Sequence, residues 1–128
     1  MGKGGFKELI VWQKAKDLAV TVYRITREGS FKRDFSLSDQ MRRAAISISS
    51  NIAEGDQRET DKEAVRFFYI AKGSAAELMS QSIIAFEIGY LDNDSSQMLE
   101  NSCAEISSML AKLISARART FRSGPAKP

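Results

Sequence analysis

Apolar side chains recur every three or four residues along four stretches of this 128-residue chain. This spacing places them on one face of an α-helix and predicts helices over residues 8–28, 37–54, 61–88 and 95–119. Short connections between such helices favour an antiparallel, up-down-up-down four-helix bundle. The sequence therefore predicts an all-α fold, in which residues 1–120 form the bundle and residues 121–128 form a mobile basic tail.

The stretch AAISISSNIAEG, residues 44–55, fits two structures. Its alternation of serine and isoleucine is typical of a β-strand, and β-branched residues favour strands. The apolar stripe of a helix begins before this stretch, however, and Gly55 stands where a helix C-terminus often has glycine. We therefore expect a helix, with the hydroxyl groups of Ser47 and Ser50 facing away from the core.

Polar residues mark the starts of three predicted helices. Thr60 and Glu63 have the spacing of a capping box, in which each side chain accepts a hydrogen bond from the other residue's backbone N–H. Ser36 or Ser38 can cap the preceding helix, and a similar pattern places the start of the last helix near Asp94.

The 61–88 helix carries apolar side chains on several faces, more than one small bundle can cover. The 37–54 helix has a second stripe of mostly small side chains, about 100° from its core stripe, which would let another helix approach closely. We therefore expect a closed homo-oligomer, a ring or barrel. The candidate interface residues are Arg42, Ile46, Ser49, Ala53, Val65, Tyr69, Ala76, Met79 and Ile83.

The residues that most enzymes and metal sites use are scarce. The chain has no histidine and one cysteine, which excludes the familiar zinc spacings. No glycine-rich phosphate loop and no catalytic pair of carboxylates stands out. Cys103 lies within an apolar seam, as a small buried residue would. We therefore expect a non-enzymatic protein without metal or cofactor. We also expect a cytoplasmic protein, since the sequence has no signal peptide or membrane-spanning segment.

Charge is distributed unevenly, although the net charge is only +3. In an up-down bundle, the start of the first helix, the 55–60 loop and the end of the last helix share one end, which is basic, while the other end is acidic. Exposed lysines and arginines attract phosphates without reading bases. The candidate nucleic-acid-binding residues are Lys3, Lys7, Arg58, Lys62, Arg66, Arg117, Arg119, Arg122 and Lys127. The alternatives are a merely solvated tail and a scaffold that binds only proteins.

Four motifs, FKELIVWQKAKDLAVTVY, QMRRAAISISSNIAEG, FFYIAKGSAAEL and EIGYL, resemble the 23S rRNA-intervening-sequence proteins, a family of four-helix bundles. These are similar to the accessory protein of diversity-generating retroelements. The resemblance implies a non-enzymatic, cytoplasmic homopentamer, and in the retroelement relatives it implies binding of RNA or DNA and of a reverse transcriptase. The family's marked positions correspond to Arg42, Arg43, Asn51, Glu54, Gly55, Gly73, Ser74 and Glu77.

Two features qualify what this resemblance implies. The family usually has proline at the position of Ser49, so we expect a weaker kink here. Several marked positions also have a purely structural interpretation. Arg43 and Glu77 could form an ion pair between helices, and Gly73 and Ser74 could simply allow close helix packing.

Overall fold

The computed structural model describes residues 5–123, with side chains through Phe121, and contains no strand in that range. It consists of four α-helices and two short 3-10 helices. In chain order these are η1 (Gly5–Glu8), α1 (Ile10–Thr26), η2 (Gly29–Lys32), α2 (Phe35–Asp56), α3 (Asp61–Glu87) and α4 (Asn93–Ser123). The all-α prediction is confirmed, and residues 44–55 are helical, as expected.

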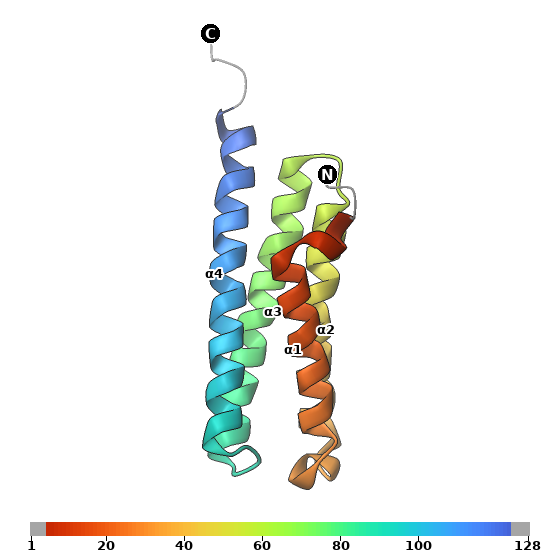
Figure 1. The fold of residues 1–128 in the computed structure, drawn as a ribbon, viewed down its shortest axis with the longest axis vertical. Coiled ribbons are helices and arrows are strands. Elements are labelled where there is room, and N and C mark those ends of the chain that lie inside the picture. The colour runs from red at the N-terminus through yellow and green to blue at the C-terminus, as the bar shows by residue number, and fades with distance from the viewer. Residues whose placement is uncertain (1–4, 124–128) are drawn as a thin grey trace.

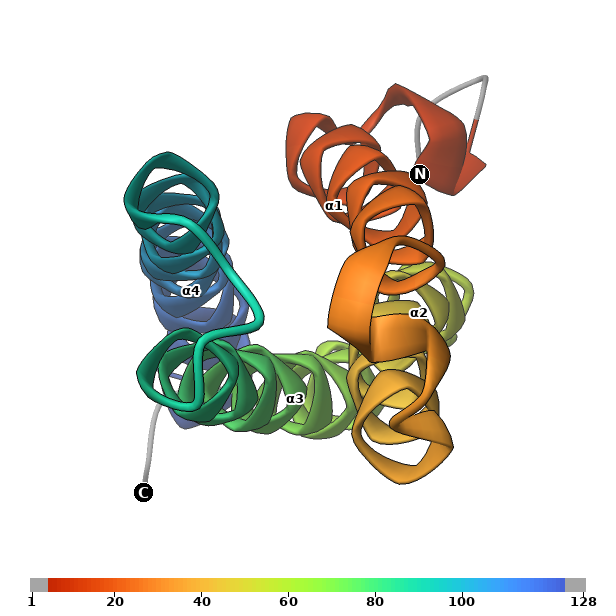
Figure 2. The ribbon, with the colours of Figure 1, turned by 90° about the horizontal axis from the view of Figure 1, so that it is seen from below.

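The four helices lie side by side along the long axis of the molecule (Figure 1). The α1–α2 and α3–α4 connections lie together at the lower end in that view. The α2–α3 connection, η1 and the C-terminal part of α4 lie at the upper end, where α4 extends beyond its neighbours. In end view, α3 lies between α2 and α4, and α1 packs mainly on α2 and less on α4 (Figure 2).

All four helices contribute to one apolar core. The α4 seam of Leu99, Cys103, Ile106 and Leu110 is fully buried and belongs to the same core cluster as buried residues of α3 such as Phe68. Burial of these side chains is the main favourable contribution to folding. No helix within residues 5–123 is both long and apolar enough to cross a membrane.

The start of α2 differs from the prediction. The N-cap is Asp34, whose Oδ1 accepts a hydrogen bond from the Leu37 N–H at 3.1 Å. Ser36 and Ser38 both lie inside the helix, and Ser38 Oγ donates instead to the backbone oxygen of Phe31 at 2.9 Å. A carboxylate at the first available position satisfies the free N–H groups, so the later serines are not needed as caps.

The observed cap of α3 involves the predicted residues, whereas the cap of α4 differs from the prediction. Thr60 Oγ1 accepts from the Glu63 N–H at 3.2 Å, which is one of the two hydrogen bonds of the predicted capping box. The cap of α4 lies two residues before the predicted Asp94, because Asp92 Oδ1 accepts from the Ser95 N–H at 2.7 Å. Hydrogen bonds from Ser95 also lower the pKa of Asp92 below its ordinary value.

Two helices continue past their predicted ends. α4 reaches Ser123, so residues 121–123 of the predicted tail are helical, while the rest of the tail lies outside the described residues. α2 reaches Asp56, so Gly55 lies within the helix rather than ending it. A Cβ at Gly55 would lie 2.6 Å from Phe68 Cε1 and 3.1 Å from the Ala64 carbonyl oxygen. The glycine therefore allows the close approach of α3.

Candidate nucleic-acid and assembly surfaces

Exposed basic side chains gather at the upper end of the bundle. Lys62 and Arg66 lie one turn apart at the start of α3. Lys7 lies on η1 and Arg119 lies near the end of α4. We call these four residues the upper-end cations: all are exposed, and none forms an ion pair with another described residue. Three further predicted residues have side chains outside the described part of the chain: Lys3, Arg122 and Lys127.

Arg58 also lies at the upper end but is partly engaged within the protein. It forms an ion pair with Glu54, one turn earlier, and its guanidinium lies 4.8 Å from the centre of the Phe67 ring. The residue remains exposed on one side. Arg58 can therefore contribute charge to the upper end, although its geometry is set by neighbours on α2 and α3.

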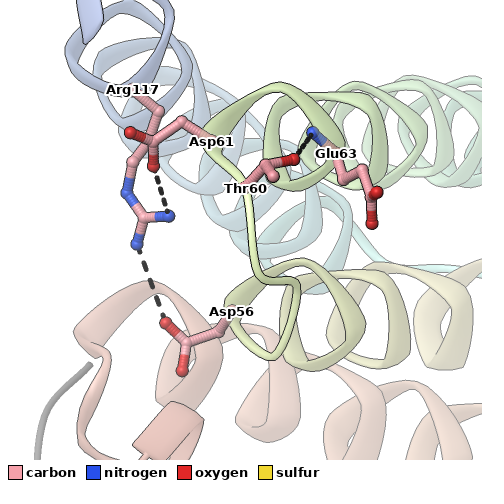
Figure 3. A network of polar contacts seen from close by, with 5 residues as sticks. All are labelled: Asp56, Thr60, Asp61, Glu63 and Arg117. Carbon is pink, nitrogen blue, oxygen red and sulfur yellow. Dashed lines mark hydrogen bonds and ion pairs between the residues drawn. The ribbon is translucent and has the colours of Figure 1, made fainter. Parts of the chain in front are cut away.

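Arg117 is half-buried and is held by two aspartates of the α2–α3 turn, as Figure 3 shows. Its Nη1 lies 3.4 Å from Asp61 Oδ1 and its Nη2 lies 3.8 Å from Asp56 Oδ1. Its guanidinium also lies 5.7 Å from the centre of the Phe68 ring. Arg117 thus joins α4 to the α2–α3 turn, and we remove it from the set of nucleic-acid candidates. The sequence did not indicate this role, because both aspartates lie far from Arg117 along the chain.

The predicted contact stripe on α2 lies at the surface of the protomer, close to α1. Ile46 is 43% exposed, while Ser49 and Ala53 are half-buried. Arg42 Nε donates to Thr26 Oγ1 at 2.8 Å, and its guanidinium lies 4.8 Å from the centre of the Tyr23 ring. We call Arg42, Ile46, Ser49 and Ala53 the α2 stripe.

The interface candidates on α3 divide into two groups. Tyr69, Ala76 and Ile83 are exposed, and Met79 is half-buried against the core. Val65 is only 7% exposed, so it belongs to the core of the protomer, and its assignment to an outer surface was wrong. Its side chain belongs to the core cluster together with Ala64 and Phe68 of α3, so it faces inward.

The predicted ion pair between Arg43 and Glu77 does not form within the protomer. Arg43 pairs instead with Asp39, one turn earlier on α2, at 2.8 Å from Nε to Oδ2. This hydrogen bond raises the pKa of Arg43 above its ordinary value. Glu77 is exposed and forms no ion pair with residues 5–123.

Ser47 lies at the contact between α2 and α3 rather than facing away from the bundle. Its Oγ lies 2.8 Å from Ser74 Oγ, and Asn51 Nδ2 donates to both the backbone oxygen and Oγ of Ser47. The prediction for Ser47 was therefore wrong, because the flank of α2 that carries it is covered by α3. Ser50 is exposed, as expected.

The glycine beside Ser74 has a different environment. Ser74 is buried between helices, in agreement with its interpretation as a small packing residue. A Cβ at Gly73 would find no atom within 4 Å, and the residue is exposed. Close packing within the protomer therefore does not explain Gly73.

The described residues contain no group of three or more cysteines, aspartates and glutamates close enough to hold a metal ion. Cys103 is fully buried, and burial raises the pKa of its thiol from 9.0 to about 12, with a further contribution from the nearby Glu100 carboxylate. A thiol with such a pKa stays protonated and is a poor nucleophile.

A model of the 23S rRNA-intervening sequence proteins matches residues 7–112. The chain belongs to this family. Among solved structures, it is similar to a protein from Bacteroides thetaiotaomicron described as of unknown function and from the S23 ribosomal protein family. The two chains share 22% identity with a TM-score of 0.78, over 83% of this chain and 96% of the other, which shows a common fold. No curated protein matches the chain.

Proposed function

We propose that the protein is a non-enzymatic, cytoplasmic accessory protein that assembles into a homo-oligomeric ring and binds nucleic acid through its upper end. The unit of assembly is an antiparallel, up-down-up-down bundle, which the alternation of the connections between the two ends supports (Figure 1). The number of copies, five, rests on the family resemblance. The same resemblance motivates a kinship with the accessory protein of diversity-generating retroelements and a reverse transcriptase as protein partner.

The observation that carries this proposal is the set of upper-end cations. Lys62 and Arg66 project from the same side of α3, since residues four apart share a helix face. Neither they nor Lys7 or Arg119 forms an ion pair with a carboxylate among the described residues. Unpaired surface cations are free to bind phosphates, and each phosphate contact releases condensed counterions.

Phosphate contact without base readout follows from the shape of this surface. The upper-end cations come from three separate elements, and no described helix presents a row of side chains suited to base edges. Assembly repeats a weakly charged surface several times around a ring. Repetition raises the effective concentration of binding sites, so a modest charge per copy can give substantial affinity.

The test removes charge from one end at a time. Lys62→Gln with Arg66→Gln is compared with Lys32→Gln and Arg33→Gln, which removes the same charge at the lower end, where both residues are also exposed. Affinity for a fluorescein-labelled RNA and a DNA duplex is measured by anisotropy over a range of salt concentrations. We expect the upper-end variant to bind at least about tenfold more weakly at low salt, with a shallower dependence on salt, while the lower-end variant changes little.

An upper-end variant that assembles normally and keeps its affinity and salt dependence would contradict nucleic-acid binding at this end. In that case the protein is better explained as a scaffold for other proteins. Both variants must first be shown by circular dichroism and light scattering to retain their helices and their mass.

A further inference from the structure

A groove runs along the outer side of the α3–α4 contact and is lined mostly by small side chains. Seven of its nine lining residues are alanine, serine or cysteine, among them Ala76 on α3 and Ala104, Ser107 and Ala111 on α4. Lys72 is the one charged residue in the lining. Such a groove leaves space for large apolar side chains from another chain.

The α2 stripe has the opposite character, since it projects a large side chain. Ile46 is 43% exposed and is flanked by the smaller Ser49 and Ala53. Arg42, at the lower end of the stripe, is fixed by Thr26 through Nε, yet its two terminal nitrogens form no ion pair with any described residue. The stripe therefore offers one apolar side chain and one oriented, unpaired cation.

The α2 stripe and a row of residues on α4 match in their spacing and in their level, that is, their height along the long axis of the bundle. Both helices begin at the lower end (Figure 1). Arg42 lies seven residues after Phe35, the first residue of α2, and Glu100 lies seven residues after Asn93, the first residue of α4. At a rise of 1.5 Å per residue, each lies about 10 Å above its helix start.

The match extends along both helices. The stripe residues are spaced four, three and four apart, and the same spacing on α4, starting from Glu100, gives Ala104, Ser107 and Ala111. Ile46 is therefore level with Ala104, where the groove has room for it. Arg42 is level with Glu100, which also forms no ion pair among residues 5–123.

These two surfaces cannot meet within one copy. In end view α2 and α4 lie on either side of the protomer, and they do not pack directly against one another (Figure 2). A rotation about an axis parallel to the helices, however, carries one copy beside the next without changing its level. Two surfaces that lie at the same height along the long axis of one copy therefore also lie at the same height where two neighbouring copies meet.

We propose that the α2 stripe of one copy docks into the α3–α4 groove of the next, with Ile46 between Ala76 and Ala104 and with Arg42 paired to Glu100. The inference rests on the proposed homo-oligomer and specifies which faces form its contact. Such a contact joins two different surfaces head to tail, and a closed rotation turns it into a ring.

The test uses two variants that each block one surface, Ile46→Arg and Ala104→Arg. Every head-to-tail contact needs one stripe and one groove, so each variant alone is expected to be a monomer by light scattering. In an equimolar mixture, the Ala104→Arg variant supplies an unchanged stripe and the Ile46→Arg variant supplies an unchanged groove. The mixture is therefore expected to form dimers of twice the monomer mass and nothing larger. Circular dichroism checks that both variants remain helical.

The other outcomes overturn the inference in distinguishable ways. If either variant alone forms a dimer, the contact joins like surfaces and is not head to tail. If both variants keep the wild-type mass, other faces form the contact. A monomeric wild-type protein would instead contradict the proposed assembly itself. Ile70→Arg is the matched control, because Ile70 is 45% exposed but belongs to neither surface, and its mass should not change.

The ion pair is tested by reversing both charges. Arg42→Glu and Glu100→Arg each place like charges opposite one another, so each is expected to reduce assembly. Because the double variant restores an opposite pair between copies, it is expected to recover mass relative to both single variants. A double variant that assembles no better than the singles would contradict the pairing.

Discussion

The contacts of α2 with α3 and of α1 with α4 hold the same bundle together in different ways. Between α2 and α3, Gly55 lies against the Phe68 ring. Between α1 and α4, an ion pair joins Lys14 Nζ to Glu105 Oε2 at 3.3 Å, with side chains 41% and 55% exposed. A surface groove lies beside this pair, lined in part by Thr21.

Apolar periodicity alone therefore does not set how closely two helices pack. α3 is covered by neighbours on two sides, whereas α1 contacts α4 only sparingly. Regions with few buried contacts open at lower free energy than the rest of a protein. We therefore expect the α1–α4 contact to open before the α2–α3 contact. Substitutions at Gly55 and Lys14 test this comparison, and Cys103 tests the packing of α4 on α3.

At neutral pH, the largest effect is expected for Gly55→Ala. The new Cβ would lie 2.6 Å and 2.9 Å from two Phe68 ring atoms, so α2 and α3 must separate or the ring must move. We expect the free energy of unfolding to fall by about 1–3 kcal/mol, as in other overpacked cores. Urea denaturation at fixed protein concentration measures the change.

Gly73→Ala is the matched control for this substitution. A Cβ there meets no atom within 4 Å, and alanine favours a helix by about 1 kcal/mol over glycine. The control should be neutral or slightly stabilising. Equal destabilisation by both substitutions would show that the α2–α3 contact is not especially close.

The second effect concerns Cys103, where α4 packs on α3. Burial raises its thiol pKa to about 12, so between pH 9 and 12 the unfolded chain loses a proton that the native protein keeps. The free energy of unfolding should therefore fall as pH rises through this range, by about 1.4 kcal/mol per pH unit from this group.

Comparison with Cys103→Ala isolates this contribution, because lysines and tyrosines titrate in the same range in both proteins. We expect the wild-type protein to lose stability faster with pH than the variant. Parallel pH profiles would mean that the thiol is not buried as closely as the α3–α4 packing requires.

The smallest effect is expected for Lys14→Met, which removes the exposed ion pair with Glu105. Such pairs contribute about 0–1 kcal/mol, so global stability should hardly change. Hydrogen exchange of α1 amides should nevertheless become faster, while exchange in α3 stays the same. A loss of stability as large as that from Gly55→Ala would contradict the expectation that the α1–α4 contact is the weaker of the two.

Much of the fold could be predicted because each helix has a strong apolar period. The exact caps could not, since Asp34, Ser36 and Ser38 can all cap a helix and the fold decides which is used. Gly55 was misassigned for a similar reason. A glycine that ends a helix and one that admits a neighbouring ring look the same in a sequence, and only the position of Phe68 separates them.

The candidate surfaces were less predictable than the fold. Charge counting placed Arg117 with the free basic residues, because its partners Asp56 and Asp61 lie 61 and 56 residues away along the chain. The burial of Val65 likewise depends on how the helices pack around α3, which the sequence pattern does not specify. The α2 stripe was found because it has the helical spacing of the core stripe but lies about 100° away from it around the helix.

The closeness of Gly55 and Phe68 also bears on the order in which the protein is made. These residues lie thirteen positions apart, whereas Lys14 and Glu105 lie 91 positions apart. On the ribosome, the α2–α3 hairpin can close soon after α3 emerges, because its contacts are local. α1 is synthesised first but must wait for α4 before its second neighbour exists. During that interval its uncovered side is accessible to chaperones and to other nascent chains.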